Sequence, residues 1–278
     1  MQPSLAMTVH DGVQCVRVTP MQRSSNRSVF VFVVDGLLID TGCASAQRDL
    51  REFYTTSAKD IDQVVLTHSH EDHAGMAAWI VEHMQRPVYI HPNGVALCAS
   101  KPDYGAYRQK LWGLRQPFRA RPLPEQFRSR THGWRALHTP GHADDHVVLL
   151  DEADGRLFCG DLFLAPKTKL IMRHESVPAI MRSLRLVLEE DFQTVFCSHN
   201  GPLHHGRRLL MKKLDNLEWL CGEILHRHRQ GWPPEAIHAH LFPEKWPIIQ
   251  ISGGEFDSIH IVHSVIREWG EEPPAERE

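Results

Sequence analysis

The chain has 278 residues, of which 42% are hydrophobic, and its 31 basic and 34 acidic residues give a formal net charge of −3. This balance lacks the excess of basic residues that is typical of nucleic-acid-binding proteins, and no run of about 18 uncharged apolar residues is long enough to cross a bilayer. We therefore expect a cytoplasmic protein that acts on a small molecule, and a homodimer remains one open alternative for its assembly.

Strand and helix signals alternate along the first ninety residues. Asp35-Gly36 is a strong two-residue hairpin signal, and it lies between two apolar runs. Apolar residues recur at helical spacing after Ser45 and again after Gly75. The elements predicted in this half are strands over 29–34, 37–40, 64–66 and 87–91, and helices over 45–54 and 76–84.

Residues 98–132 interrupt this alternation. The stretch is rich in proline and arginine, contains Tyr104, Tyr107, Trp112 and Phe118, and has no helical or strand periodicity. Long irregular segments in compact domains are often functional. We therefore predict that 98–132 is a lid-like insertion that faces the substrate.

The second half repeats the order of the first. Glu152-Ala153-Asp154-Gly155 indicates the turn of another hairpin, and Ser176 is a suitable first residue for an amphipathic helix. The predicted elements are strands over 134–139, 147–150, 156–159 and 194–197, and helices over 176–188, 209–229, 234–241 and 256–269.

Two β-rich halves of this kind predict a fold of the α/β (α+β) class. The sheets would pack face to face with helices outside them, which gives a four-layer αββα sandwich. We assign residues 1–205 to this domain and residues 206–278 to a C-terminal helical region beside the mouth of the active site.

The segment His68-Ser69-His70-Glu71-Asp72-His73 is the strongest functional signal. It follows the apolar run Val64-Val65-Leu66 and precedes a predicted helix, so it is neither a terminal tag nor an isolated structural histidine. His68 and His70 lie two residues apart and face the same way from an extended segment, and the chain then turns to present Asp72 and His73. One short loop can thus reach two adjacent cations.

Three further residues follow predicted strands on short turns. They are His142 in Thr139-Pro140-Gly141-His142, Asp161 in Phe158-Cys159-Gly160-Asp161, and His199 in Cys197-Ser198-His199. Histidine and aspartate are common in turns, so each signal alone is weak. Their combination with the first motif predicts one metal centre. Its nitrogen and oxygen donors suit zinc, iron and manganese. Of these divalent ions we expect zinc, with iron and manganese as alternatives.

These motifs, together with Leu38-Ile39-Asp40-Thr41-Gly42, resemble those of the metallo-β-lactamase superfamily of metallohydrolases. The resemblance implies one metal held by His68, His70 and His142, a second held by Asp72, His73 and His199, and Asp161 as the bridge between them. It also implies that Asp40 orients a ligand, with Asp145 and His146 as further residues behind the ligands; for His146 a structural role is equally open. Asp72 and Asp161 would be the catalytic carboxylates.

Such a centre implies a hydrolase in which a metal-bridging hydroxide attacks an ester, thioester or lactone carbonyl. His70 stands where flavodiiron members of the superfamily carry glutamate, which favours the hydrolase branch. The segment 141–161 is similar to lactamase-β-2-like hydrolases and to the quinolone-signal response thioesterase, and glyoxalase II enzymes share the ligand set. Thioester hydrolysis is therefore preferred. Candidate substrate contacts are Tyr104, Tyr107, Lys167, Lys169, Arg173 and His174.

Three alternatives remain at this stage. The chain can be a metal-binding response or regulatory protein with residual thioesterase activity, a mononuclear iron persulfide oxygenase, or a phosphodiesterase of the same fold. The charge balance disfavours the last of these, because a nuclease needs a basic docking surface.

Overall fold

The computed structural model describes residues 4–20 and 27–270. Its first sheet has seven strands, and they follow one another in sheet order as they do in the chain. The predicted hairpin is confirmed, because Asp35 and Gly36 both have positive φ (48° and 81°) and join two antiparallel strands. The seven strands are β1 (Leu5–His10), β2 (Val13–Val18), β3 (Val29–Val34), β4 (Leu37–Ile39), β5 (Gln63–Val65), β6 (Val88–Ile90) and β7 (Arg121–Pro122).

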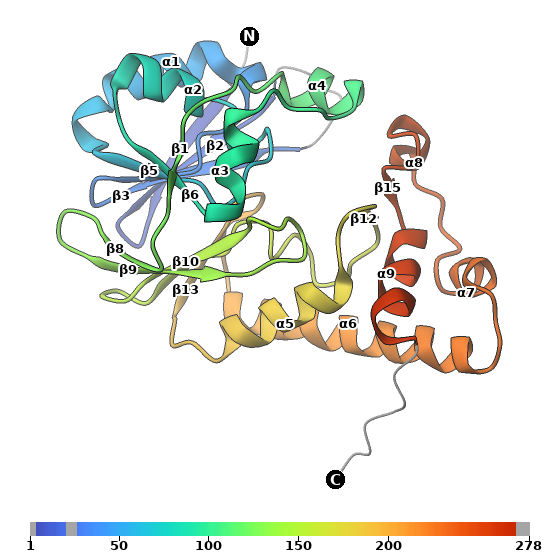
Figure 1. Ribbon diagram of the computed structural model, residues 1–278. Coiled ribbons are helices and arrows are strands. Elements are labelled where there is room, and N and C mark those ends of the chain that lie inside the picture. Colours follow the sequence, from blue (N-terminus) through green and yellow to red (C-terminus); the bar gives the residue numbers. More distant parts are fainter. Residues whose placement is uncertain (1–3, 21–26, 271–278) are drawn as a thin grey trace.

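Helices cover one face of this sheet (Figure 1). Their buried residues, such as Leu50, Tyr54 and Ile80, pack on Val16, Val31 and other residues of the strands. The helical segments are the 3₁₀ turns Ala44–Ala46 and Ala58–Asp60, α1 (Gln47–Thr56), α2 (Ala77–Trp79) with the π-helical turn Ile80–Met84, α3 (Pro92–Ala99) and α4 (Ala106–Trp112).

The second sheet has six strands in the order β14-β13-β11-β10-β9-β8. Because β10 is antiparallel to both β9 and β11, and β11 is parallel to β13, the carboxyl ends of β9, β11 and β13 meet at one edge. The strands are β8 (Gln126–Arg128), β9 (Gly133–His138), β10 (Val147–Asp151), β11 (Arg156–Phe158), β13 (Thr194–Cys197) and β14 (Gly201–Leu203).

The two sheets enclose an aromatic core. Phe32 from the first sheet contacts Phe158 and Phe196 from the second, with ring centroids 5.4 Å and 5.6 Å apart. Phe158 and Phe196 stack at 4.7 Å, and Trp134 is 1% exposed beside them. Offset or edge-to-face rings of this kind contribute beyond their buried area. Aromatic contacts between the two sheets therefore stabilise the β-sandwich.

Further helices cover the other face of the second sheet, which confirms the predicted αββα arrangement (Figure 1). Ser176 begins the first of them, and its hydroxyl accepts a hydrogen bond from the Ala179 amide. These helices share one apolar core with the second sheet. They are α5 (Val177–Leu188), α6 (Gly206–Arg229), α7 (Pro234–Leu241) and α9 (Ile259–Trp269). The short helix α8 (Pro247–Ile251) lies outside this core and contacts β15 (Phe256–Asp257), which pairs with β12 (Ile171–Met172) in a small separate sheet.

Residues 98–132 differ from the expected irregular insertion. The segment contains α4, and its second half supplies β7 to the first sheet and β8 to the second. Those residues thus belong to the sandwich, and the part that covers the site is α4 with its flanking turns. Strands of two or three residues are too short to produce a periodic pattern, which explains why the sequence did not indicate them.

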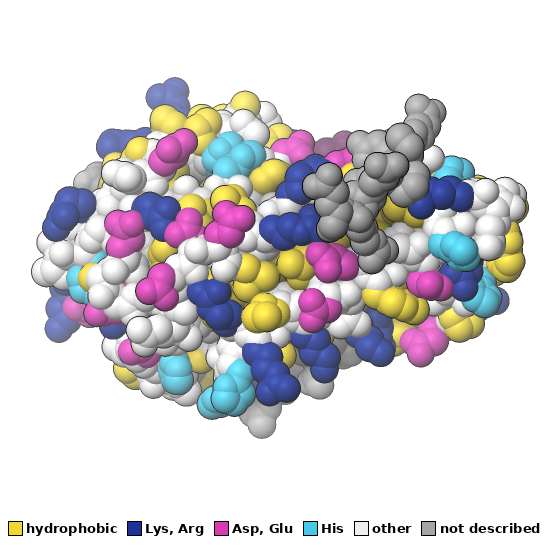
Figure 2. Space-filling model, turned by 90° about the horizontal axis from the view of Figure 1, so that it is seen from below, with side chains coloured by type: hydrophobic (Ala, Val, Ile, Leu, Met, Phe, Trp, Pro, Cys, Tyr) yellow, Lys and Arg dark blue, Asp and Glu magenta, His cyan; other side chains and the backbone are white. Residues whose placement is uncertain are grey.

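The surface seen from below carries basic, acidic and apolar side chains interspersed with one another (Figure 2). Within residues 4–20 and 27–270, no helix has both the length and the apolar content needed to span a bilayer.

Candidate metal centre

The loop after β5 is held in one conformation by contacts on both sides. The Ala74 amide donates to the carbonyl of His70 at 2.8 Å, and the Thr41 amide donates to the carbonyl of His73 at 2.6 Å. A side-chain carbon at Gly75 would lie 2.5 Å from the Glu71 carbonyl oxygen, so only glycine fits there. These contacts hold the backbone of residues 68–75 in place and so fix the positions of the imidazole and carboxylate groups that the loop carries.

The structure brings all seven predicted donors together. Two clusters have donor atoms within 4.8 Å of one another, His68, His70 and His142 in one and Asp72, His73 and His199 in the other. Asp161 lies between the clusters. Its carboxylate oxygens are 3.4 Å from His73 Nε2, 3.5 Å from His142 Nε2 and 3.2 Å from His199 Nε2. The arrangement matches two adjacent cation sites with one shared carboxylate.

A test of this interpretation is whether the donors are satisfied without a cation. His68 Nε2, His73 Nε2 and Asp161 Oδ1 are buried and have no hydrogen-bond partner among the described residues. Unpartnered buried polar atoms cost free energy, and three of them converging on one space are rare in a folded protein. Divalent cations would satisfy all three, so the residues present fit the metals.

Asp40 orients one of the candidate ligands. It follows β4 with a φ of 59°, is fully buried, and its Oδ2 lies 2.8 Å from His73 Nδ1. The Thr67 amide and the Ser198 hydroxyl also donate to its carboxylate, at 2.8 Å and 3.2 Å. The hydrogen bond from His73 places the proton of that ring on Nδ1 and leaves Nε2 free to face the centre.

Asp40→Ala is expected to weaken metal binding and to lower kcat/KM, each by about 10- to 100-fold, because His73 loses its orienting acceptor. Metal affinity is measured by competition with a chelator, and the rate with whichever ester proves to be hydrolysed. Asp60→Ala, an exposed carboxylate in the 3₁₀ turn before β5, is the control. Unchanged metal affinity in a folded Asp40→Ala protein would contradict the role assigned to Asp40.

Other donors are oriented by groups that are distant in sequence. His142 Nδ1 is 3.3 Å from Glu175 Oε2, and His199 Nδ1 donates to the Ser28 carbonyl at 2.8 Å. His146 does not reach the centre; its Nε2 accepts a hydrogen bond from the Asp161 amide at 3.0 Å and so fixes the backbone of that residue. Asp145 is buried behind the metal loop, and burial raises the pKa of its carboxyl group.

The electrostatics of the two clusters differ. Burial and the neighbouring histidines hold the pKa values of His68 and His70 well below the usual range, so both rings are neutral. Burial alone would also lower the pKa of His73, but the carboxylates of Asp161, Asp72 and Asp40 raise it to about 9. In the same way, Asp161 and Asp72 overcome burial and raise the pKa of His199 to about 10.

These pKa values predict a pH-dependent response to metal removal. Protonation of His73 and His199 stabilises the metal-free fold fully below the unfolded pKa of about 6.5, and this contribution is lost as the pH rises through about 9 and 10. Bound cations need both rings neutral. The increase in Tm on adding zinc to chelator-treated protein is therefore expected to grow between about pH 7 and about pH 9. Thermal unfolding scans measure it; an increment that shrinks with pH would contradict the assignment.

The centre opens into a cavity of about 510 Å³ with mostly apolar walls. Leu111 and Trp112 of α4 form one side, and Met172 and Phe256 of the small sheet form another. The Trp112 ring lies 6.3 Å from that of His199. Residues of α4 and of the C-terminal region thus line the same cavity.

The six predicted substrate contacts fall into two groups. Tyr107, Lys167 and Lys169 line the cavity. Tyr104 instead fixes the turn after α4, because its hydroxyl donates to the Gly113 carbonyl at 2.9 Å and accepts from the Arg115 amide. Arg173 donates to the Gly254 carbonyl, and the exposed His174 ring lies 6.0 Å from that of His70 outside the cavity lining.

Arg108 is a central residue that the sequence did not reveal. It is 9% exposed, and its guanidinium group makes two hydrogen bonds of 2.6 Å to Glu71 and one of 3.0 Å to Glu255. Burial raises the pKa of Glu71, while Arg108 lowers it. Because Glu71 precedes Asp72, Arg108 ties the metal loop to α4 and to the turn before β15.

Lys213 of α6 is a second residue of this kind. It is 5% exposed, lines the cavity, and its ammonium group donates to the Leu162 carbonyl directly after Asp161 at 2.6 Å. Burial lowers its pKa. A lysine within a long amphipathic helix gives no local sign of such a contact.

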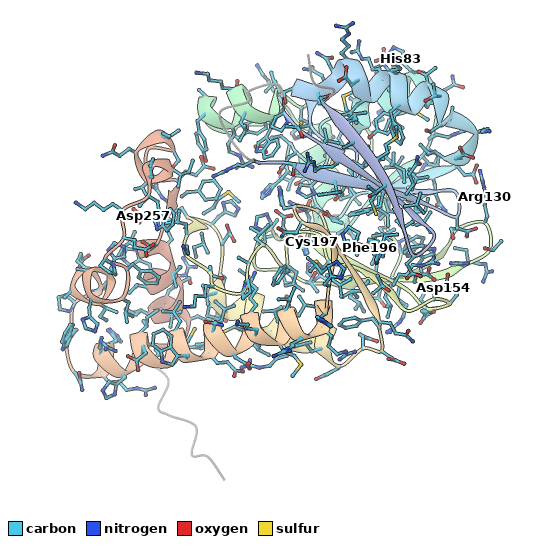
Figure 3. The ribbon with its side chains drawn as sticks, turned by 180° about the vertical axis from the view of Figure 1, so that it is seen from behind. His83, Arg130, Asp154, Phe196, Cys197 and Asp257 are labelled. Carbon is cyan, nitrogen blue, oxygen red and sulfur yellow. The ribbon has the colours of Figure 1, made fainter. Side chains whose placement is uncertain are left out.

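A further group of possible ligands lies away from the metal centre and has other partners. His132, Asp151 and Asp154 cluster near Arg156, which is 3.2 Å from Asp151 and 2.5 Å from Asp154. Figure 3 labels Asp154 and Arg130 at the end of the sandwich remote from the C-terminal helices, whereas Cys197 lies in the middle of the molecule. The arginine neutralises this cluster, so it is an ion-pair network of the far end.

Comparison with known proteins agrees with this geometry. A family model described as the metallo-beta-lactamase superfamily matches residues 26–199, which include all seven donors. The chain belongs to the metallo-β-lactamase superfamily. The resemblance read from the sequence motifs is thereby confirmed.

Relatives within the superfamily include enzymes. The chain is 31% identical over 229 residues to the probable metallo-hydrolase YqjP of Bacillus subtilis, covering 67% of this chain and 72% of that protein. It is 27% identical over 175 residues to an atrochrysone carboxyl ACP thioesterase of Passalora fulva, covering 61% of this chain and 46% of that one. A metallo-beta-lactamase family protein of Thermus thermophilus has the same fold, with a TM-score of 0.68, 20% identity and 95% of each chain covered.

Proposed function

We propose that this superfamily member is a binuclear metal-dependent hydrolase of acyl esters, with thioesters as its preferred class. The observation that carries the proposal is the pair of donor clusters sharing Asp161 at the floor of an apolar-walled cavity. Two divalent cations held there, zinc above all, would polarise the scissile carbonyl and lower the pKa of a water molecule to near neutrality.

The chain's own residues supply the rest of the chemistry. His68, His70 and His142 would hold one cation, and Asp72, His73 and His199 the other, while Asp161 fixes their separation. Asp40 holds the proton of His73 on Nδ1. Glu175 orients His142 in the same way, through Nδ1 of the His142 ring. Trp112 and its apolar neighbours keep bulk water from the reacting carbonyl, which strengthens every charge interaction in the cavity.

The cavity walls favour an acyl substrate over a phosphodiester. Leu111, Trp112, Met172 and Phe256 contribute apolar surface that matches an acyl chain or an aromatic leaving group, beside charged residues of the lining such as Lys167 and Lys169. This apolar surface is the reason that we place an acyl substrate before a polyanion. The carrier-protein thioesterase among the relatives supports the same class of reaction.

A substrate panel with metal analysis tests the proposal. Protein purified without chelator and reconstituted with zinc, iron or manganese is expected to bind two metal ions per chain and to hydrolyse model thioesters and aryl esters, with weaker or no cleavage of phosphodiesters. Rapid phosphodiester cleavage without acyl hydrolysis would overturn the substrate class. One iron per chain with oxygen consumption would replace the binuclear hydrolase by an oxygenase.

A further inference from the structure

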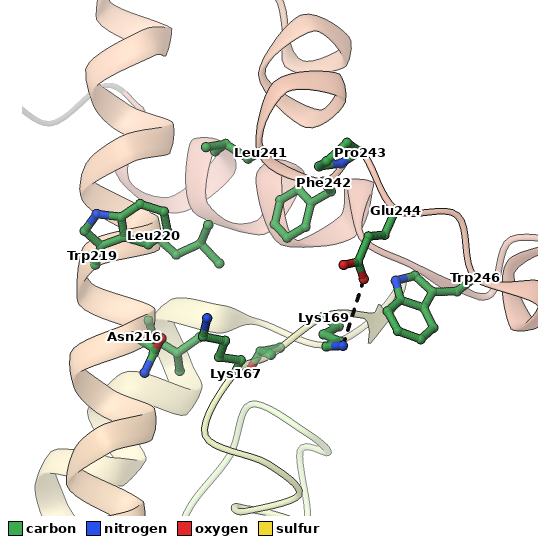
Figure 4. A pocket seen from close by; sticks show the side chains of 12 residues that line it. Lys167, Lys169, Asn216, Trp219, Leu220, Leu241, Phe242, Pro243, Glu244 and Trp246 are labelled. Atoms are coloured by element: carbon green, nitrogen blue, oxygen red, sulfur yellow. Dashed lines mark ion pairs between the residues drawn. The ribbon is translucent and has the colours of Figure 1, made fainter.

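A second cavity of about 490 Å³ lies beside the metal cavity (Figure 4). It is enclosed by α6, by the segment that follows α7, and by residues 167–169. None of the seven metal-centre donors lines it. The function proposed above therefore leaves this space without a role.

The floor of the second cavity is apolar. Leu217 and Leu220 of α6 are 1% and 7% exposed, and Leu241 and Phe242 close the opposite side. Trp219 stands at the rim and is 61% exposed, which is a large apolar area to leave in water. These apolar walls suit an aliphatic or aromatic group, and the polar groups of the lining, among them Asn216 and Glu244, complete the cavity.

The two cavities share one wall. Lys167, Thr168, Lys169 and Trp246 line both of them, and this segment begins six residues after Asp161. A ligand with its carbonyl at the metal centre would have to extend over the 167–169 segment to reach the second cavity. The shared wall thus places the second cavity next to the cavity of the metal centre.

The charged groups of the shared wall lie at the edge of the second cavity. Lys169 Nζ lies 4.4 Å from the Trp246 ring centroid and 3.9 Å from Glu244, and Figure 4 shows this ion pair at the side of the cavity. Lys167 makes no ion pair with any described residue and is exposed. Lysine can bury its methylene stem and keep its ammonium group in water, so both stems can contribute apolar surface to the shared wall.

We propose that the second cavity binds the apolar tail of the substrate, so that the enzyme selects acyl groups long enough to reach past Lys167 and Lys169. This inference rests on the proposed acyl hydrolase function. It assigns the metal cavity to the reacting carbonyl and leaving group, and the cavity between α6 and the 241–246 segment to the far end of the acyl chain.

Chain-length selectivity tests the proposal. For the parent protein, kcat/KM for a dodecanoyl thioester is expected to exceed that for the butanoyl thioester on the order of 100-fold, if about four of its eight additional methylene groups leave water. Asn216→Trp fills the second cavity from α6, and Trp219→Ala removes part of its wall. Both variants are expected to reduce that ratio, Asn216→Trp by about tenfold or more, while the butanoyl rate is unchanged.

The matched control is Trp232→Ala, because Trp232 is also exposed, at 39%, but lines neither cavity. It should keep the parental ratio. Thermal unfolding of each variant verifies that the fold is intact. A parental ratio retained in both Asn216→Trp and Trp219→Ala would overturn the assignment of the second cavity.

A binding measurement separates this proposal from the hydrolase function. Decanol has no carboxylate to ligate a cation, and its binding to the metal-loaded protein is followed by calorimetry. Binding that Asn216→Trp weakens about tenfold, without acyl turnover in any variant, would refute the hydrolase function and keep the cavity assignment. Acyl turnover without decanol binding and without chain-length selectivity would refute the cavity assignment alone.

Discussion

Asp161→Ala is expected to lower kcat/KM by about 1000-fold or more while the protein stays folded. Asp161 is the only one of the seven donors that approaches His73, His142 and His199 together, at 3.2 to 3.5 Å. Without its carboxylate the two cation positions lose their common ligand, and several kcal/mol of transition-state stabilisation are lost with it. Steady-state kinetics on the best ester, metal analysis and circular dichroism together measure the effect.

Asp191→Ala is the control for this substitution. Asp191 is an exposed carboxylate between α5 and β13 and is not one of the seven donors, so its removal should leave rate and metal content unchanged. The mechanism is wrong if the Asp161→Ala protein is folded and keeps near-parental hydrolysis.

Arg108→Ala is expected to destabilise the fold by about 3–5 kcal/mol, because it leaves the Glu71 carboxylate buried without its partner. Glu71 is 2% exposed and both of its oxygens accept from Arg108 at 2.6 Å. Metal affinity should fall as well, since Glu71 and Asp72 are adjacent. Urea unfolding of the metal-loaded protein measures the first effect, and chelator competition the second.

The pH dependence of the same variant gives a second measurement. Burial already raises the pKa of Glu71, and loss of Arg108 raises it further. An acid whose folded pKa is raised loses stability as the pH rises above its unfolded pKa of about 4.5, so the stability of Arg108→Ala relative to the parent should be lower at about pH 8 than at about pH 5. Adding Glu71→Gln should recover part of the loss. Arg119→Ala, which removes an exposed arginine in the same segment, is the control. Equal losses of stability in both arginine variants would contradict the role assigned to Arg108.

Local patterns in the chain were sufficient to predict which imidazole and carboxylate groups lie together at the candidate centre. Four donors lie within six residues of the metal loop, and the other three follow strand ends on short turns, two of which include glycine. Amphipathic periodicity likewise predicted α5, α6 and α9, and the turn residues predicted the hairpin at Asp35-Gly36. These features depend on neighbours in the chain, which a sequence displays directly.

The surroundings of the centre became visible only once the chain was folded. Arg108 meets Glu71 across 37 residues and Glu255 across 147, and Glu175 reaches His142 from another element. Tyr104 and Tyr107 are alike in sequence, yet the first bonds to the backbone after α4 and the second lines the cavity. Such contacts are fixed by how the sheets and helices pack together, and packing between distant segments leaves no periodic trace in the chain.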